Sequence, residues 1–532
     1  MKRRDFLQKS IPAATLLPAL INGYSVKAFA ADSPLVQALM QSTTDTDHVL
    51  VIIQLSGGND GLNTLIPISN YSNYFNARSN VAIPQNRILA LGSSGAGIHP
   101  SMTGLHTLHN NGMMKAIQAV GYPQPNFSHF RATDIWMTAS NSNQEAFSGW
   151  AGRYLNYEYP NFPIGYPNTN ATDPLAIQIG STTSLTTQGP AVNMAMSITN
   201  PTSFYNLLNG TTDPVPDTPA GKELKYVRLV SQQTQKYSTV IRGAANAVTQ
   251  QVTYPTNNSL ADQLKIVARL VKGGLKTRVY MVSFGGFDTH SVQVNAADTT
   301  TGAHATLLQR VSDACKAFQD DLQFLGVQDR VIGMTYSEFG RRIKSNSSVG
   351  TDHGAAAPMF LFGSKIEAGV LGNNPDIPVN ASVNDNLPMQ YDFRSVYSTI
   401  LEKWFCLDKT VVAGLYPPNI NAQLQSLPLF KSNITCNVTT PPPIATTDKT
   451  IYNYPQPFTN TTEIFFKTQG GHTLIQIIDT LGRVIATLLE KEYVGATSDK
   501  VTFNAEVLPP GVYYARLQNG VTQKVWPMLK VR

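Results

Sequence analysis

Several acidic and histidine side chains are spaced so that they could hold a metal ion or a phosphoryl group. Between two short apolar runs, a polar loop carries Glu338, Arg341 and the adjacent residues Asp352 and His353. Such charges are costly to place between buried strands unless something binds them. These residues predict one wall of a metal or phosphoryl-type site, in which Glu338 is either a further ligand or an ion-pair partner of Arg341 or Arg342.

Two more loops carry the same residue types. Asp288 and His290 stand two positions apart, so both side chains can face one centre from a loop. Asp60 follows Gly57 and Gly58, which allow the chain to turn sharply at the end of an apolar run. This Gly-Gly loop lacks the spacing of a nucleotide-binding motif, so we expect its role to be the placement of Asp60.

Ser128 and His129 begin a helix-like segment after a further apolar run. At a helix N-terminus, Ser128 could be an exposed nucleophile, because the helix dipole favours an anion there. It could equally be only the residue that caps this helix. In the same way, His129 is either a base beside Ser128 or a packed core histidine.

The apolar runs explain how these loops could meet. Each run has the length and continuity of a buried strand, and helix-like segments lie between them. This repetition predicts an α/β sheet with helices on both faces, and ligands bind such sheets beyond the carboxyl ends of the strands. The middle of the chain, about 140–260, reads mostly as an insertion. The expected strands are residues 48–55, 114–120, 278–284, 330–335 and 358–362.

Residues 1–30 are typical of a twin-arginine signal peptide. Two adjacent arginines precede an apolar stretch at 11–21, and Ala28-Phe29-Ala30 forms a small-x-small cleavage pattern. A membrane anchor is disfavoured, because the stretch is too short to span about 30 Å of hydrocarbon. The segment carries a net charge of +4, so only about +2 of the formal +6 remains for the mature chain. We therefore expect the twin-arginine export machinery as a partner, no membrane span in the mature chain and no nucleic-acid binding.

The composition changes again after residue 436. Residues 437–450 are rich in proline and threonine and predict a linker between an α/β domain, 31–436, and a second domain, 451–532. The second domain alternates apolar and polar positions, which predicts a small antiparallel β-sandwich. Cys406 and Cys436 could pair in an oxidising compartment, but their spacing does not establish the bond.

Six segments together resemble the bacterial family called domain of unknown function 1501, whose members are exported by the twin-arginine route. The resemblance covers about residues 47–418, in the same order. The family is placed in the alkaline phosphatase/sulfatase-like superfamily, so the resemblance implies an alkaline phosphatase-like sheet with metals at its carboxyl edge. The segments are Gly57-Gly-Asn-Asp-Gly-Leu-Asn63, Ser128-His-Phe-Arg-Ala-Thr-Asp-Ile-Trp136, Phe287-Asp-Thr-His290, Ser337-Glu-Phe-Gly-Arg-Arg342, Thr351-Asp-His-Gly354 and Asp392-Phe-Arg-Ser-Val-Tyr397.

The resemblance also implies roles for single residues. Ser128 would attack an ester with His129 beside it, and Arg131 or Arg341 would hold the anionic group. The metal would be divalent, zinc or else Mn²⁺, Mg²⁺ or Ca²⁺. The implied metal ligands are Asp60, Asp288, His290, Asp352 and His353.

Two features depart from the superfamily pattern. The chain has no Cys/Ser-x-Pro-x-Arg sulfatase signature, and no histidine follows His353 within residues 354–436, where alkaline phosphatases use one. We predict an exported metal-dependent hydrolase of phosphate or sulfate esters, which the Asp/His pairs favour. The alternative is a non-catalytic surface or secreted binding protein that retains the fold, which the missing histidine favours.

The C-terminal domain resembles a type IX secretion sorting domain, through Ile478-Asp-Thr-Leu-Gly-Arg483 and Leu508-Pro-Pro-Gly-Val-Tyr-Tyr514. This resemblance implies the type IX secretion machinery as a partner. It also implies transit through the periplasm to the cell surface or the extracellular space. The alternative is an ordinary binding or spacer β-domain.

Overall fold

The computed structural model divides the chain into two compact units, residues 46–437 and residues 1–45 with 438–532. The predicted signal peptide and linker lie outside the described residues, apart from the strands β1 (Ala19–Ile21) and β2 (Tyr24–Val26) and Thr450. Residues 479–483 and 520 of the tail also lie outside. The described residues are 19–21, 24–26, 46–159, 162–163, 166–168, 171–190, 192–201, 236–417, 419–420, 424–432, 434, 436, 450–455, 458–478, 484–509, 511–519 and 522–530.

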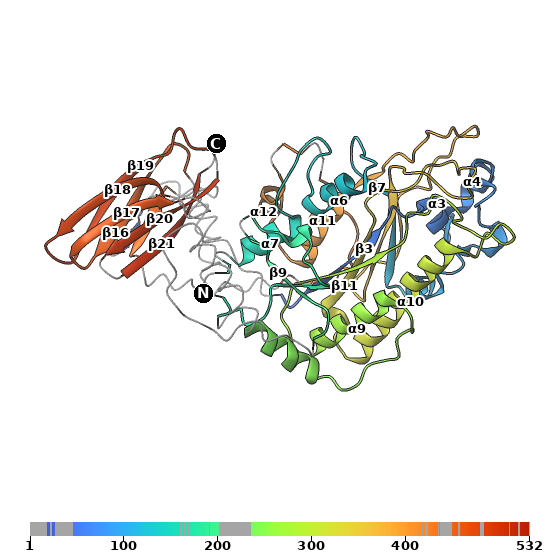
Figure 1. Cartoon of the computed structure of the whole chain (residues 1–532), viewed down its shortest axis with the longest axis horizontal. Helices are drawn as coiled ribbons and strands as arrows, with labels where there is room; N and C mark the ends of the chain where they lie inside the picture. Colours follow the sequence, from blue (N-terminus) through green and yellow to red (C-terminus); the bar gives the residue numbers. More distant parts are fainter. Residues whose placement is uncertain are drawn as a thin grey trace. The chain divides into compact units, whose positions relative to one another are not determined.

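A nine-stranded sheet runs through the first unit (Figure 1). Its strands are β3 (Val49–Ser56), β7 (Met114–Gly121), β8 (Ala176–Ile179), β9 (Ala195–Ile198), β10 (Val279–Gly285), β11 (Val331–Tyr336), β12 (Ala357–Phe362), β13 (Gly369–Leu371) and β14 (Tyr391–Asp392). Their order is β13-β7-β12-β11-β3-β10-β8-β9, with β14 also paired to β7. β12 is antiparallel to both neighbours, and the other pairs are parallel.

The five strands expected from the apolar runs are all present in this sheet. The expectation of an insertion at about 140–260 is wrong in part, because β8 and β9 in this segment extend the sheet beyond β10. Each of these two strands has only four residues, too few to stand out as an apolar run.

Helices cover both faces of the sheet because alternate residues of a strand point to opposite sides. Val51 and Ile53 of β3 belong to one apolar core with α5 (Thr103–Asn110), α9 (Ser259–Lys272) and α10 (Ala303–Phe324). Leu50 and Ile52 belong to another, with α6 (His129–Thr138), α7 (Trp150–Glu158) and α11 (Phe393–Thr399). The prediction of an α/β sheet with helices on both faces is confirmed.

Smaller elements complete the first unit. The helices are α3 (Gly61–Thr64), α4 (Tyr71–Arg78) and α12 (Lys409–Gly414), with a π-helix η6 (Ile400–Trp404) directly after α11. A separate small sheet contains β4 (Leu65–Pro67), β5 (Leu89–Ala90) and β6 (Ala96–Ile98). The short 3₁₀ turns are η2 (Ile68–Asn70), η3 (Gln85–Arg87), η4 (Leu185–Thr187) and η5 (Gln328–Arg330).

The C-terminal unit consists of two antiparallel sheets that share one apolar core. One sheet has the order β15-β16-β19 and the other β18-β17-β20-β21. This arrangement confirms the predicted antiparallel β-sandwich. The strands are β15 (Ile451–Tyr454), β16 (Thr461–Thr468), β17 (Gly471–Ile478), β18 (Val484–Tyr493), β19 (Thr497–Asn504), β20 (Gly511–Asn519) and β21 (Thr522–Lys530).

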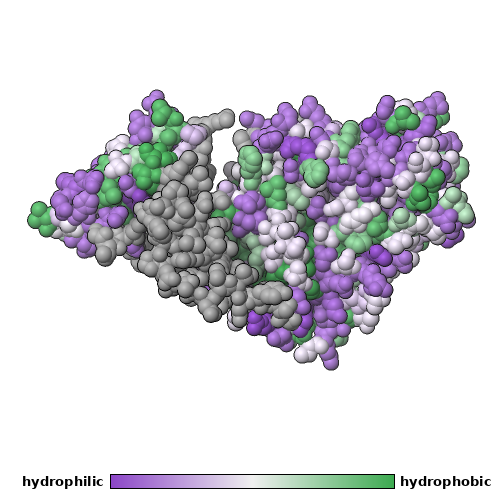
Figure 2. Space-filling view, in the orientation of Figure 1, coloured by the Kyte–Doolittle hydropathy of each residue, from purple (hydrophilic) through white to green (hydrophobic). Residues whose placement is uncertain are grey.

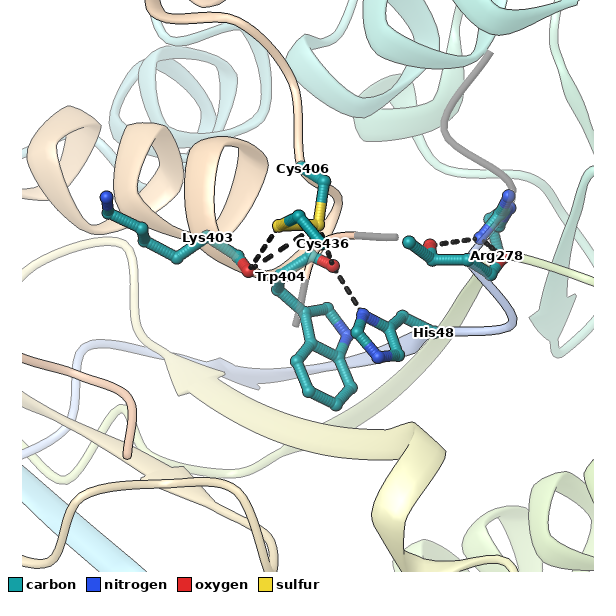
Figure 3. Close-up of a disulfide and its surroundings, with 7 residues drawn as sticks. His48, Arg278, Lys403, Trp404, Cys406 and Cys436 are labelled. Atoms are coloured by element: carbon teal, nitrogen blue, oxygen red, sulfur yellow. Dashed lines mark hydrogen bonds between the residues drawn. A yellow bond between two sulfur atoms is a disulfide. The ribbon is translucent and has the colours of Figure 1, made fainter. Parts of the chain in front are cut away.

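A disulfide joins Cys406 to Cys436, with 5.5 Å between the Cα atoms (Figure 3). Beside it, the His48 ring stacks on Trp404 at 3.9 Å between centroids, and the Trp404 indole N–H donates to the carbonyl of Val49 at 3.1 Å. The bond therefore fastens the last residues of the first unit to the helix that packs on its first strand.

A Cys406→Ser/Cys436→Ser variant should lose about 2–4 kcal/mol of unfolding free energy in the first unit, because its unfolded chain is no longer closed into a loop. Denaturant unfolding with and without reductant measures this loss. Reductant should destabilise the wild type and leave the variant unchanged. An equal effect of reductant on both proteins would contradict a stabilising disulfide.

Among the described residues, no helix is long and apolar enough to cross a membrane. The face shown in Figure 2 is mostly hydrophilic where it displays described residues, with apolar side chains scattered over it.

Candidate metal centre

Three of the polar loops meet because β3, β10 and β11 are adjacent and parallel, which places their carboxyl ends at one edge of the sheet. The loops approach each other closely. A Cβ on Gly57, whose φ is +122°, would lie 2.4 Å from the backbone nitrogen of Asp288, and one on Gly350 would lie 2.3 Å from the carbonyl oxygen of His290. Only glycine permits this packing, so both glycines help to bring the two side chains to the edge.

Asp288, His290 and His353 converge on one point. Nε2 of His290 and Nε2 of His353 are 2.8 Å apart, and each lies 3.2 Å from Oδ1 of Asp288. The side chains are between 22% and 47% exposed, so the point is reachable from solvent. Three potential ligand atoms thus face one another at the sheet edge.

Hydrogen bonds fix which ring nitrogen carries the proton. Nδ1 of His353 lies 2.8 Å from the carbonyl oxygen of Phe127, and Nδ1 of His290 lies 3.1 Å from Oδ1 of Asp352. Both oxygens can only accept, so each Nδ1 donates and each Nε2 of a neutral ring keeps its lone pair. When both rings are neutral, the two lone pairs face each other and the Asp288 carboxylate, and a cation between them would turn their mutual repulsion into attraction. The donor set therefore fits a metal ion.

His129 adds a third imidazole to this group. Its Nδ1 lies 2.9 Å from Oε1 of Glu338, and its Nε2 lies 3.5 Å from Oδ2 of Asp288. One ligand atom each from His129, Asp288 and His353 lie within 4.8 Å of one another. Glu338 is almost fully buried, accepts the backbone N–H of Gly57 at 2.8 Å, and pairs with a histidine rather than with an arginine. A carboxylate behind a ring is how many metal-ligating histidines are oriented.

The protonation states also suit a metal. Burial alone would raise the pKa of Asp288 and of Asp352, but their hydrogen bonds, from Arg341 to Asp288 and from Asn346 to Asp352, bring both pKa values below the ordinary value. Burial lowers the pKa of His353. At neutral pH the carboxylates are ionised and this ring is neutral, which are the forms that bind metals.

Neither predicted anion-binding arginine is free to bind an anion. The buried Arg341 donates to Oδ1 of Asp288 at 2.7 Å and to the carbonyls of Gly58 and Thr351 at 2.6 and 2.8 Å. It therefore orients Asp288 and joins three loops. Arg131 donates to the backbone carbonyls of Asn141, Ser142 and Gln144.

The structure does not bring Asp60 to the other predicted ligands. Asp60 is fully buried, and Nη1 of Arg78 donates to its two carboxylate oxygens at 2.7 and 2.8 Å. Nε2 of Gln293 also donates to it at 2.6 Å, and Oε1 of Gln293 accepts the hydroxyls of Thr289 and Thr351. Asp60 therefore supports the site loops through Gln293, and its charge is already paired.

Ser128 stands at the N-cap position of α6, directly before His129. It is exposed, and its side chain makes no capping bond to the backbone of the helix. The capping alternative thus lacks its hydrogen bond, and the hydroxyl stays a predicted nucleophile.

Family comparisons agree with both resemblances found in the sequence. Residues 47–414 match the family described as "Protein of unknown function (DUF1501)", and residues 452–529 match the "Secretion system C-terminal sorting domain". The second match points to secretion and to a surface or extracellular location. Among curated proteins, none matches this chain in sequence.

Solved structures similar to the chain include sulfatases and alkaline phosphatase-superfamily proteins. A sulfatase from Pseudoalteromonas sp. is 9% identical over 89% of this chain and 88% of its own, with a TM-score of 0.31. A protein in the alkaline phosphatase superfamily from Vibrio parahaemolyticus is 10% identical over 70% and 71%, with a TM-score of 0.29. The lipoteichoic acid synthase LtaP from Listeria monocytogenes is 10% identical over 68% and 80%, with a TM-score of 0.27. At these scores the likeness supports no conclusion about activity.

Proposed function

The chain belongs to the DUF1501 family, and we propose that it is an exported, metal-dependent hydrolase of phosphate or sulfate esters. The observation that carries this proposal is the convergence of three imidazole Nε2 atoms on Asp288. Each ring is held from behind by an oxygen that accepts its Nδ1 proton: Phe127, Glu338 or Asp352. Such preorganisation of free lone pairs has a clear use in holding a metal.

The residues that would hold the metal are His129, Asp288, His290 and His353. Three imidazole nitrogens and one carboxylate oxygen suit zinc, whereas Mg²⁺ and Ca²⁺ prefer oxygen ligands. We therefore propose zinc, with Mn²⁺ as the next candidate. When bound, such an ion polarises an ester and stabilises the negative charge that develops on it.

The other residues of the site either orient the proposed ligands or take part in the reaction. Glu338 and Asp352 fix the rings of His129 and His290, and Arg341 fixes Asp288. Ser128 would supply the attacking oxygen, since its hydroxyl is exposed beside His129.

A second candidate is a binding protein that keeps the metal but does not turn over an ester. The commitment of Arg131 and Arg341 to backbone carbonyls and Asp288 favours it, because ester hydrolases commonly place a cation on the anionic group. The two functions differ in turnover and agree in metal content.

Export is proposed in two steps. Residues 1–30 would direct the chain through the twin-arginine machinery into the periplasm, and the sorting domain, residues 451–532, would pass it to the type IX machinery. Residues 31–436 would then form the site domain, joined to the tail by the linker 437–450.

The test uses the purified full chain. We expect about one metal ion per chain by elemental mass spectrometry, and hydrolysis of 4-nitrophenyl sulfate, 4-nitrophenyl phosphate or bis(4-nitrophenyl) phosphate. Ser128→Ala should keep the metal and lose at least about 10³-fold in kcat, whereas Ser72→Ala, an exposed serine on α4, should match the wild type. Metal without turnover would favour the binding protein, and a folded chain without metal would exclude both functions.

A further inference from the structure

A hollow of about 380 Å³ opens beside the proposed metal centre. It adjoins His129 and Glu338, and the glycine loops after β3 and β10 form part of its wall. Its lining includes Gly57, His129, Phe130, Thr133, Asp134 and Glu338. Because His129 lines it, the hollow could bind the part of a substrate that lies outside the metal centre.

The charge of this wall is negative. The carboxylates of Asp134 and Glu338 both line the hollow, and no lysine or arginine does so among the described residues. Arg131 lies on the same helix as Asp134 but donates to backbone carbonyls instead. Arg341, which pairs with Asp288 at 2.7 Å, has a fully buried side chain.

The charges around the centre leave little attraction for a dianion. Asp288, Asp352 and Glu338 bring three negative charges, while Arg341 and a divalent ion bring three positive ones. Each additional negative charge on a ligand is then repelled by Asp134, and no lysine or arginine among the described lining residues offsets this repulsion. A ligand with one negative charge meets half of the repulsion that a doubly charged one does.

One aromatic side chain supplies an apolar surface to the same wall. Phe130 is 86% exposed and lines the hollow, so its ring is open to contact with a ligand there. Its ring faces could pack on an aryl group or on the C–H face of a sugar ring.

We infer that the hollow takes the ring-bearing alcohol part of a singly charged ester, a sulfate monoester or a phosphate diester, and selects against phosphate monoesters. This inference rests on the proposed function, since the hollow is assigned to the substrate of that centre. Asp134 supplies the charge selectivity and Phe130 the apolar contact.

The test compares two non-hydrolysable ligands of similar shape at pH 8.5 and low salt. Benzenesulfonate carries one negative charge there, and phenylphosphonate carries two. Calorimetry on the metal-loaded full chain gives the ratio of their affinities. Asp134→Asn should shift this ratio towards phenylphosphonate by about ten-fold, and added salt should reduce the shift.

Two variants serve as controls. Thr133→Val, an uncharged change on the same wall, should leave the ratio as in the wild type. Phe130→Ala should weaken both ligands to the same extent, about five-fold, with the metal content unchanged. An unchanged ratio in Asp134→Asn, or a failure of both ligands to bind the wild type, would overturn the inference.

The outcome is separable from that of the proposed function. Turnover of any of the three 4-nitrophenyl esters with metal bound supports the hydrolase whatever the ligand ratio shows. Faster turnover of the phosphate monoester than of the sulfate and the diester, together with an unchanged ratio in Asp134→Asn, would overturn the inference and leave the proposed hydrolase function standing.

Discussion

A His353→Ala variant is expected to lose its metal, whereas Asp352→Ala should keep it with an affinity reduced by about 10–100-fold. Nε2 of His353 lies at the point where the ligand atoms converge, so no neighbour replaces it. Asp352 instead touches the far nitrogen of His290. Replacement of Asp352 by alanine frees the His290 ring to turn but leaves His290 itself in place as a ligand.

The measurement is a competition of each purified variant with a zinc chelator of known affinity. His472→Ala is the matched control, because His472 pairs with Glu490 at 3.2 Å on the surface of the C-terminal unit, and it should bind metal as the wild type does. Equal losses in His353→Ala and Asp352→Ala would mean that both residues are ligands, and the division into ligand and orienting residue would then be wrong.

The sequence could predict which loops meet at the candidate site, because the signal is local. Continuous apolar runs predict buried strands, and β3, β10 and β11 carry Gly57, Asp288 and Glu338 directly behind their ends. Parallel pairing then brings these ends to one edge whatever the details of the loops. The sequence alone could therefore predict that these loops lie together at one site.

The roles of the individual residues within the site could not be predicted from the sequence. Asp60 has the residue type and strand-end position of a ligand, but Arg78, eighteen residues later on α4, neutralises it. The spacing of the two residues does not predict that they form a pair. The carbonyl of Phe127 is likewise invisible in a sequence, since every residue has one and only the backbone direction decides which of them meets His353. Only the orientation of its ring distinguishes His129 from a core histidine, and the sequence does not give that orientation.

The sequence also led to the expectation that Arg131 or Arg341 would hold the anionic group, and the structure shows why this expectation is wrong. Arg341 stands beside the acidic residues in the sequence and has the chemistry to bind an anion. Its guanidinium is instead used to join backbone carbonyls of separate loops, where each N–H removes an otherwise unpaired acceptor. Long-range partners of this kind depend on packing, which residue types do not specify.

Removal of one member of the buried pair of Asp60 and Arg78 should strongly destabilise the first unit. Both side chains are 0% exposed, so removing either leaves the other as an unpaired charge in the core. Asp60→Ala is expected to lower the unfolding free energy by about 3–5 kcal/mol. Asp320→Ala, which breaks the surface pair with Lys316, should cost at most about 0.5 kcal/mol. Denaturant unfolding of both variants beside the wild type measures the difference.

The same pair sets a pH dependence. Burial raises the pKa of Asp60, but Arg78, His304 and Gln293 outweigh it and hold the pKa below the ordinary value of 3.8. The unfolded chain therefore takes up this proton at a higher pH than the folded chain, so stability is present above about pH 4 and falls as the pH drops towards the folded pKa. An Asp60→Asn variant should be less stable at neutral pH and lose less stability on acidification. Parallel stability curves for the two proteins below pH 4 would show that the charge of Asp60 is not what holds these loops together.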